Sequence, residues 1–207
     1  IAKETGRRIV EMVKKDVKPR DIVNEDSFRN AIAVDMAIGG STNTALHIPA
    51  ISKDFGTPVT LDTFDEISRD VPHITSLRPA GPFTIRDLDD AGGIPAVLKR
   101  LKPFLRDRPT YNGKTVFEIA DAAVVKNETV LKSIEDPYHK QGGIAVLKGN
   151  LAPQGSVVKQ AAVDPKMMKF SGNAKVFNSE NEARDAIVSG KIVPGDVVVI
   201  RYEGPKG

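Results

Sequence analysis

The 207-residue chain contains no cysteine and no tryptophan. The lack of cysteine excludes disulfides, thiolate nucleophiles, cysteine-ligated zinc and cysteine-ligated iron–sulfur clusters within these residues. Aromatic residues make up only 5% of the chain, which argues against the stacking platforms that bind single-stranded nucleic acid. No apolar run approaches the roughly 20 residues of a membrane-spanning helix, and no segment has the pattern of a secretory signal peptide.

Charge of one sign is also scarce, because 30 basic and 27 acidic residues leave a formal net charge of only +3. The two signs are interspersed, so we expect neither a nucleic-acid partner nor a membrane partner. Hydrophobic residues are 40% and charged residues 28% of the chain, as in ordinary globular proteins. The chain starts at Ile1 and ends in a Gly/Pro segment at Gly207, so we expect it to be a piece of a longer protein.

The first two thirds of the chain are predicted to be helical, because apolar residues recur there at helical spacing. Asn24 or Asp26 is expected to cap the second of these helices, and Asp62 or Thr63 the fourth. Pro19 marks residues 17–24 as a connector. The predicted helices cover residues 1–16, 25–38, 41–55, 61–70, 84–91, 94–104 and 115–123.

The pattern changes after about Gln141 to short β-like runs bounded by Gly, Pro and Asn. One helix, residues 180–189, interrupts these runs and is expected to stop at Gly190. We therefore predict an α/β (α+β) chain with a helical domain over residues 1–141 and a β-rich, barrel-like domain over residues 142–207. The predicted strands are residues 144–148, 156–161, 174–178 and 196–202.

Residues 31–51, AIAVDMAIGGSTNTALHIPAI, carry most of the functional information. Asp35 is the only charge in a helix that is apolar almost all round, so its carboxylate is expected to be buried and to need hydrogen-bond partners. Gly39-Gly40 should end that helix, and Ser41 or Thr42 should cap the next one, which is also apolar. Two buried helices are thus expected to meet at a small polar turn.

Two interpretations of this turn remain open. A buried helix N-terminus binds carboxylate or phosphate readily, and Asn43 and His47 lie four residues apart on one helix face beside it. Alternatively, the turn is a self-satisfied cap and His47 is hydrogen-bonded in the core. Spacing alone favours the second interpretation, since N-caps are common.

Other candidate sites have simpler explanations. Residues 112–115 read NGKT, but a phosphate-binding loop requires a glycine where Arg108 stands, so a capped turn is expected instead. The acidic run at residues 86–90 lies in a first helical turn, where acids are common. The three histidines, His47, His73 and His139, are too scattered in the sequence to suggest a ligand set.

The string DMAIGGSTNTALHIPAI at residues 35–51 resembles the dihydroxy-acid dehydratase family, which includes phosphogluconate and other sugar-acid dehydratases. So do AGGIPAVLK at residues 91–99, GGIAVLKGNLAPQGSVVK at 142–159 and VVIRYEGPKG at 198–207, in the same order. The resemblance is closer to the dihydroxy-acid branch, because the phosphogluconate enzymes carry a histidine where Thr44 stands.

The resemblance implies a hydro-lyase that removes water from a small 2,3-dihydroxy acid to give a 2-keto acid in valine and isoleucine biosynthesis. It implies an iron–sulfur cluster as Lewis acid and a magnesium ion that holds the substrate. The family places the ligands of both groups and the catalytic base outside these 207 residues, so no catalytic residue and no metal ligand is assigned within them. The family's cluster-bearing N-terminal domain and swivelling-type C-terminal domain would both be represented.

Six residues are predicted to lie near the cluster or the substrate: Gly39, Gly40, Ser41, Thr42, Asn43 and His47. We expect the parent enzyme to be a cytoplasmic homodimer with both cofactors, and the chain alone to bind neither and to be inactive. A sugar-acid dehydratase of the same family and a non-catalytic binding or dimerisation module remain as alternatives.

Overall fold

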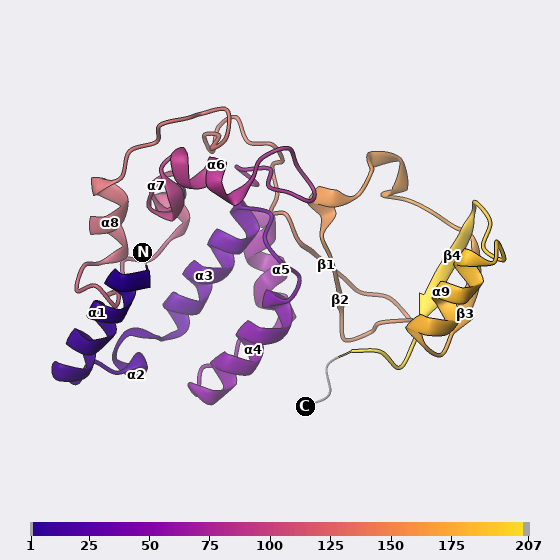
Figure 1. Ribbon diagram of the computed structural model, residues 1–207, viewed down its shortest axis with the longest axis horizontal. Coiled ribbons are helices and arrows are strands. Elements are labelled where there is room, and N and C mark those ends of the chain that lie inside the picture. Colours follow the sequence, from indigo (N-terminus) through magenta and orange to yellow (C-terminus); the bar gives the residue numbers. More distant parts are fainter. Residues whose placement is uncertain (1, 205–207) are drawn as a thin grey trace. The chain divides into compact units, whose positions relative to one another are not determined.

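A computed structural model describes residues 2–204, and the chain divides into two compact units between Ala162 and Val163. The first unit is mostly helical and ends in one strand pair; the second is a small α/β unit (Figure 1). The elements of the first unit are α1 (Ala2–Lys14), α2 (Pro19–Ile22), α3 (Glu25–Ala37), α4 (Thr44–Asp54), α5 (Leu61–Asp70), α6 (Ile85–Asp90), α7 (Gly93–Leu101), a 3-10 turn (Lys102–Phe104), α8 (Val116–Ala122), β1 (Ala145–Leu147), β2 (Ser156–Val158) and a 3-10 turn (Gln160–Ala162).

Helix α3 is the centre of the first unit, where it packs against both α5 and α7. Ile32 and Met36 of α3 are fully buried, as are Phe64 of α5 and Leu101 of α7. These residues belong to one hydrophobic cluster, whose burial is the main stabilising contribution to the unit. The apolar periodicity that predicted α3, α5 and α7 is therefore the signature of this core.

The strand pair β1–β2 is antiparallel, with Val146 opposite Val157, and β1 lies beside α5. Two glycines immediately before β1 attach it to the helices through the backbone. Gly142 N donates to Ser68 O of α5, and Gly143 N donates to Met36 O of α3, both at 2.8 Å. The C-terminal end of α3 is thus held by the segment that leads into β1.

The second unit has a 3-10 turn (Pro165–Met167), β3 (Asn173–Phe177), α9 (Glu180–Val188) and β4 (Asp196–Ile200). Strands β3 and β4 are parallel, with Asn173 opposite Asp196 and Phe177 opposite Ile200. Helix α9 connects them, because parallel neighbours need a crossover, and it buries Ala183 and Ala186. Gly190 follows α9 with φ +72°, which confirms the expected stop signal. The mixed α/β composition that the sequence predicted is confirmed.

Several local predictions were wrong. Residues 17–24 contain the short helix α2, because Pro19 stands at the first helical position, where its missing N–H costs nothing. The N-cap of α5 is Thr60, two residues before Asp62 and three before Thr63, the predicted caps. Asn24 is confirmed as the cap of α3, since its side chain accepts a hydrogen bond from Ser27 N at 3.0 Å.

Helix α4 was expected to be buried, and it is not. Within the described chain it buries only Ser52, whereas Leu46 is 45% and Ile51 49% exposed. It also begins at Thr44 and not at Ser41. Apolar composition alone misled the prediction, because among the described residues α4 packs on the core only in part, through Ala45 and Ile48. No helix among residues 2–204 is both long and apolar enough to cross a membrane.

Candidate functional site

The predicted turn lies between α3 and α4. Gly39 has φ +60°, a backbone conformation that glycine adopts without strain, and it reverses the chain at the end of α3. Gly40 N donates to Asp35 O at 2.9 Å, which closes the last turn of the helix. We call residues 39–44, GGSTNT, the glycine turn.

Asp35 anchors this turn from within α3. The residue is only 8% exposed, and each of its carboxylate oxygens accepts one hydrogen bond. Ser41 N donates to Oδ1 at 3.1 Å and Thr44 Oγ1 donates to Oδ2 at 2.7 Å. Burial raises the pKa of the Asp35 carboxyl, while the bonds from Thr44 and Ser41 and the charge of Lys159 act in the opposite direction. The expectation that this buried carboxylate has partners is confirmed.

We expect Asp35→Ala to lower the free energy of unfolding by about 2 kcal/mol, because it leaves the Ser41 N–H without its acceptor and removes the charged acceptor of the Thr44 hydroxyl, which keeps only Ser41 O. Asp35→Asn should lose about half of that or less. Its amide oxygen can accept from Ser41 N, and its NH₂ can donate to Thr44 Oγ1, which can turn its own hydrogen to Ser41 O at 2.6 Å. Urea denaturation of the three proteins measures this. Equal losses in both variants would show that the bonds to Asp35 do not hold the turn.

The two glycines of the turn are enclosed on three sides. A Cβ on Gly40 would stand 1.8 Å from Asp35 Oδ1, and one on Gly39 would stand 2.6 Å from His73 Nε2. A Cβ on Gly143 would stand 2.4 Å from Gly39 Cα. A side chain at any of these positions would force a neighbour to shift, and at Gly143 that neighbour is backbone, so close packing as well as hydrogen bonding holds the turn.

The six predicted residues lie in this turn or just after it. Gly39 is buried, Gly40 and Thr42 are half-buried, and Ser41, Asn43 and His47 are exposed. His47 is thus not hydrogen-bonded in the core, contrary to the second interpretation. Its backbone N–H donates to Asn43 O at 2.9 Å, as expected for residues four apart. The polar groups of Ser41, Asn43 and His47 are accessible to a ligand.

The N-cap of α4 is Asn43 and not Ser41 or Thr42, and within residues 2–204 its side chain makes no capping bond. Ser41 takes the capping role from outside the helix. Its Oγ accepts from Asn43 N at 3.2 Å and its carbonyl accepts from Thr44 N at 3.1 Å. These N–H groups are therefore already paired, so a ligand here would depend on side chains more than on the helix N-terminus.

Sequence reasoning missed a pair of histidines beside the turn. His73 Nδ1 lies 2.7 Å from His139 Nδ1, although the two residues are 66 positions apart. The pKa of His73 is lowered to about 4, chiefly by burial and also by the charges of His139 and Lys159, while a backbone hydrogen bond with Thr75 acts in the opposite direction. Only the fold brings these residues together, so no spacing in the sequence could have indicated the pair.

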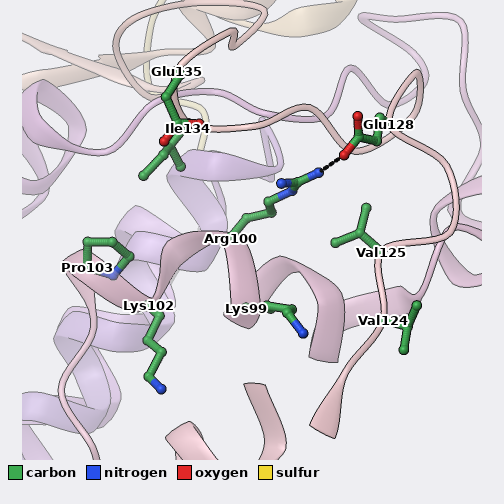
Figure 2. A pocket seen from close by; sticks show the side chains of 9 residues that line it. All are labelled: Lys99, Arg100, Lys102, Pro103, Val124, Val125, Glu128, Ile134 and Glu135. Atoms are coloured by element: carbon green, nitrogen blue, oxygen red, sulfur yellow. Dashed lines mark hydrogen bonds and ion pairs between the residues drawn. The ribbon is translucent and has the colours of Figure 1, made fainter. Parts of the chain in front are cut away.

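A cavity of about 730 Å³ in the first unit lies beside α7, and none of the six predicted residues lines it (Figure 2). Three cations stand on its wall, but each has a partner. Lys99 Nζ donates to Ala123 O at 2.7 Å, Arg100 pairs with Glu128 at 2.7 Å, and Lys102 pairs with Asp121. The carboxylates of Glu128 and Asp121 offset two of these charges, whereas the Lys99 ammonium is bonded to a neutral carbonyl and keeps its charge. Because none of the six predicted residues lines this cavity, the glycine turn remains the candidate site.

The other sequence candidates are structural. Thr115 of NGKT caps α8 and exchanges hydrogen bonds with Glu118, and Thr84 caps α6 in the same way with Asp87. The expected capped turn at NGKT is confirmed, and the acidic run begins in the first turn of α6, as expected. In the part of the chain that the structure describes, no three His, Cys, Asp or Glu side chains are grouped so that they could hold a metal ion. With no cysteine, these residues do not fit an iron–sulfur cluster either.

The chain matches two models of one protein family. Residues 1–119 match the family model described as dihydroxy-acid/6-phosphogluconate dehydratase N-terminal, and residues 129–207 match its C-terminal counterpart. The chain belongs to the dihydroxy-acid/6-phosphogluconate dehydratase family.

Curated relatives named dihydroxy-acid dehydratase match the chain along its whole length. Proteins of that name from Archaeoglobus fulgidus and Methanococcus maripaludis strain C7 are 54% and 56% identical over 207 and 208 residues. One from Thermodesulfovibrio yellowstonii is 55% identical over 207 residues. The chain spans 38% of the length of each.

Proposed function

We propose that this chain is part of a dihydroxy-acid dehydratase, a hydro-lyase that converts 2,3-dihydroxy-3-methyl acids into branched 2-keto acids for valine and isoleucine biosynthesis. The observation that carries the proposal is the identity of 54–56% over the whole chain with proteins of that name. In this reaction a base removes the proton on C2, the hydroxyl on C3 leaves as water, and the enol becomes the 2-keto acid.

We propose that the glycine turn lines the substrate or cluster side of the parent enzyme. Ser41 and Thr42 carry hydroxyls, Asn43 an amide and His47 an imidazole, which are suitable hydrogen-bond partners for a carboxylate or a hydroxyl. Gly39 and Gly40 let the backbone pass close to its surroundings. Asp35 and the closely packed Gly39 and Gly40 would hold these groups in a fixed geometry, as a binding site requires.

The iron–sulfur cluster and magnesium of the family belong to this proposal as groups held by residues outside the chain. The residues described here offer neither thiolates nor a grouped carboxylate site. No catalytic step is assigned to any of the 207 residues. We also propose a cytoplasmic homodimer for the parent, a domain boundary near residue 141, and a barrel-like, swivelling-type C-terminal domain.

A sugar-acid dehydratase is the second candidate, because the matched family model covers 6-phosphogluconate dehydratases as well. Thr44 favours the dihydroxy-acid branch. Its hydroxyl bonds Asp35 at 2.7 Å within a packed turn, at the position where phosphogluconate enzymes carry a much larger histidine.

The test is an assay of the complete enzyme that contains this chain, purified without oxygen. We expect formation of a 2-keto acid from dihydroxyisovalerate and no turnover of gluconate or phosphogluconate. Turnover of the sugar acids alone would overturn the proposed branch, and absence of all three activities would overturn the dehydratase. As a control, the 207-residue chain treated with iron, sulfide and magnesium is expected to be inactive.

A further inference from the structure

The two histidines beside the glycine turn meet in one plane. Their rings are nearly parallel, at 7°, and the centroids are 5.0 Å apart. Rings stacked face to face could not bring two nitrogens to 2.7 Å. In an edge-to-edge arrangement the centroid separation is the 2.7 Å between the nitrogens plus the two ring radii, which is about the observed separation. The two Nδ1 atoms therefore point at each other along the line that joins the two ring centroids. This is the geometry of an N–H···N hydrogen bond, which needs one proton between two nitrogens.

The surroundings of His73 decide which ring carries that proton. His73 is 2% exposed, and its Nε2 has no hydrogen-bond partner among the described residues. Nε2 faces Gly39 so closely that a Cβ there would stand 2.6 Å away. A proton on Nε2 would be pressed against the Cα hydrogens of Gly39, whereas a lone pair there can accept a weak Cα–H contact. The proton of His73 must then be on Nδ1.

We propose that His73 and His139 form a one-proton pair with fixed tautomers, in which His73 Nδ1–H donates to His139 Nδ1, and that His73 is a positioning residue for the glycine turn. His139 then carries its own proton on Nε2. Because His139 is exposed on the surface, that Nε2–H can donate to water. His73 in turn presents a bare nitrogen to Gly39 and blocks any movement of the turn toward it.

The backbone supports the same arrangement. His73 N donates to His139 O at 3.0 Å, and Tyr138 N donates to His73 O at 2.9 Å. The next residue along the chain, Ile74, donates its N–H to Ala37 O at 2.8 Å, two residues before Gly39. These backbone hydrogen bonds join residues 73–74 to residues 138–139 on one side and to the end of α3 on the other. The backbone that carries the imidazole pair is therefore held in place.

The tautomers can be read directly by long-range ¹H–¹⁵N NMR on the 207-residue chain at about pH 7.5. With three histidines, the assignment is simple and the exposed His47 is an internal reference. We expect a protonated Nδ1 and a bare Nε2 on His73, and the reverse on His139. The opposite pattern, or averaged tautomers on both rings, would overturn the assignment whether or not any variant folds.

The positioning role is tested by His139→Ala and its matched control His139→Asn, whose side-chain oxygen can still accept from His73. We expect exchange of the Gly40 amide hydrogen to become about fivefold faster in the alanine variant, which loses one hydrogen bond, and to stay near wild type in the asparagine variant. Equal exchange in all three proteins would overturn the role.

In the complete enzyme, and resting on the proposed function, kcat should fall by about the same factor in His139→Ala and recover in His139→Asn. If kcat were unchanged in the alanine variant of an active enzyme, only the proposed effect of the histidine pair on catalysis would be overturned. An inactive wild-type enzyme would overturn the proposed function, while the NMR and exchange results would still decide the histidine pair.

Discussion

Gly143→Ala is expected to destabilise the first unit by about 3 kcal/mol or more. The new Cβ would stand 2.4 Å from Gly39 Cα, 3.3 Å from its nitrogen and 3.4 Å from its carbonyl carbon. These are backbone atoms, which cannot rotate aside as a flexible side chain can. Gly143 N also donates to Met36 O at 2.8 Å, so relief of the clash would break the bond between α3 and the segment before β1.

Gly149→Ala is the matched control for this substitution. It lies six residues further on, and a Cβ there would meet nothing within 4 Å. Denaturant titrations at one pH, followed by far-UV circular dichroism, compare the two variants with wild type. We expect the Gly149 variant within about 0.5 kcal/mol of wild type. If the Gly143 variant unfolded at the same denaturant concentration as the Gly149 variant, the glycine turn would accommodate a side chain more easily than its packing indicates.

The protonation of His73 by itself should lower the free energy of unfolding by about 3 kcal/mol as the pH drops from about 6.5 to 4. The folded protein lowers the pKa of His73 from 6.5 to about 4, mainly because the imidazole is buried. Between these values the unfolded chain binds the proton and the folded chain does not. This contribution is therefore complete above about pH 6.5 and is lost as the pH falls toward the folded value.

Other groups near the pair titrate as well, so a variant must isolate His73. His139 and Lys159 are the charged groups that act on it, and the Tyr138 ring lies 6.1 Å away. The contribution of Asp35 to stability changes with pH in the opposite direction to that of His73, because burial raises the pKa of its carboxyl. In His73→Asn the titrating group is absent. The stability gap between wild type and this variant should shrink from pH 7 to pH 4, and parallel curves would contradict the assignment.

The sequence predicted the local features of the glycine turn well. A lone charge in an apolar helix indicated that Asp35 is buried and hydrogen-bonded, and Gly39-Gly40 indicated the end of that helix. Both follow from interactions over a few residues, for which helix propensity and capping rules suffice.

Long-range features could not be predicted in the same way. Helix α4 is apolar in composition, yet Leu46 and Ile51 remain exposed, because burial depends on which elements cover a helix. The contact of His73 with His139 depends on how segments 66 residues apart are brought together. The packing of Gly143 on Gly39 likewise exists only in the folded chain, so nothing in the local sequence marks Gly143 as indispensable.

The parallel pair β3–β4 has a consequence for handling the protein. Within the described residues each strand pairs with one neighbour only, so the outer edge of each presents backbone donors and acceptors without strand partners. Val176 and Ile200 are 52% and 42% exposed on these strands. Edges of this kind are templates for strand addition between molecules. In concentrated solutions of this chain, self-association is therefore expected to start in the second unit, and charged residues introduced on these edges should delay it.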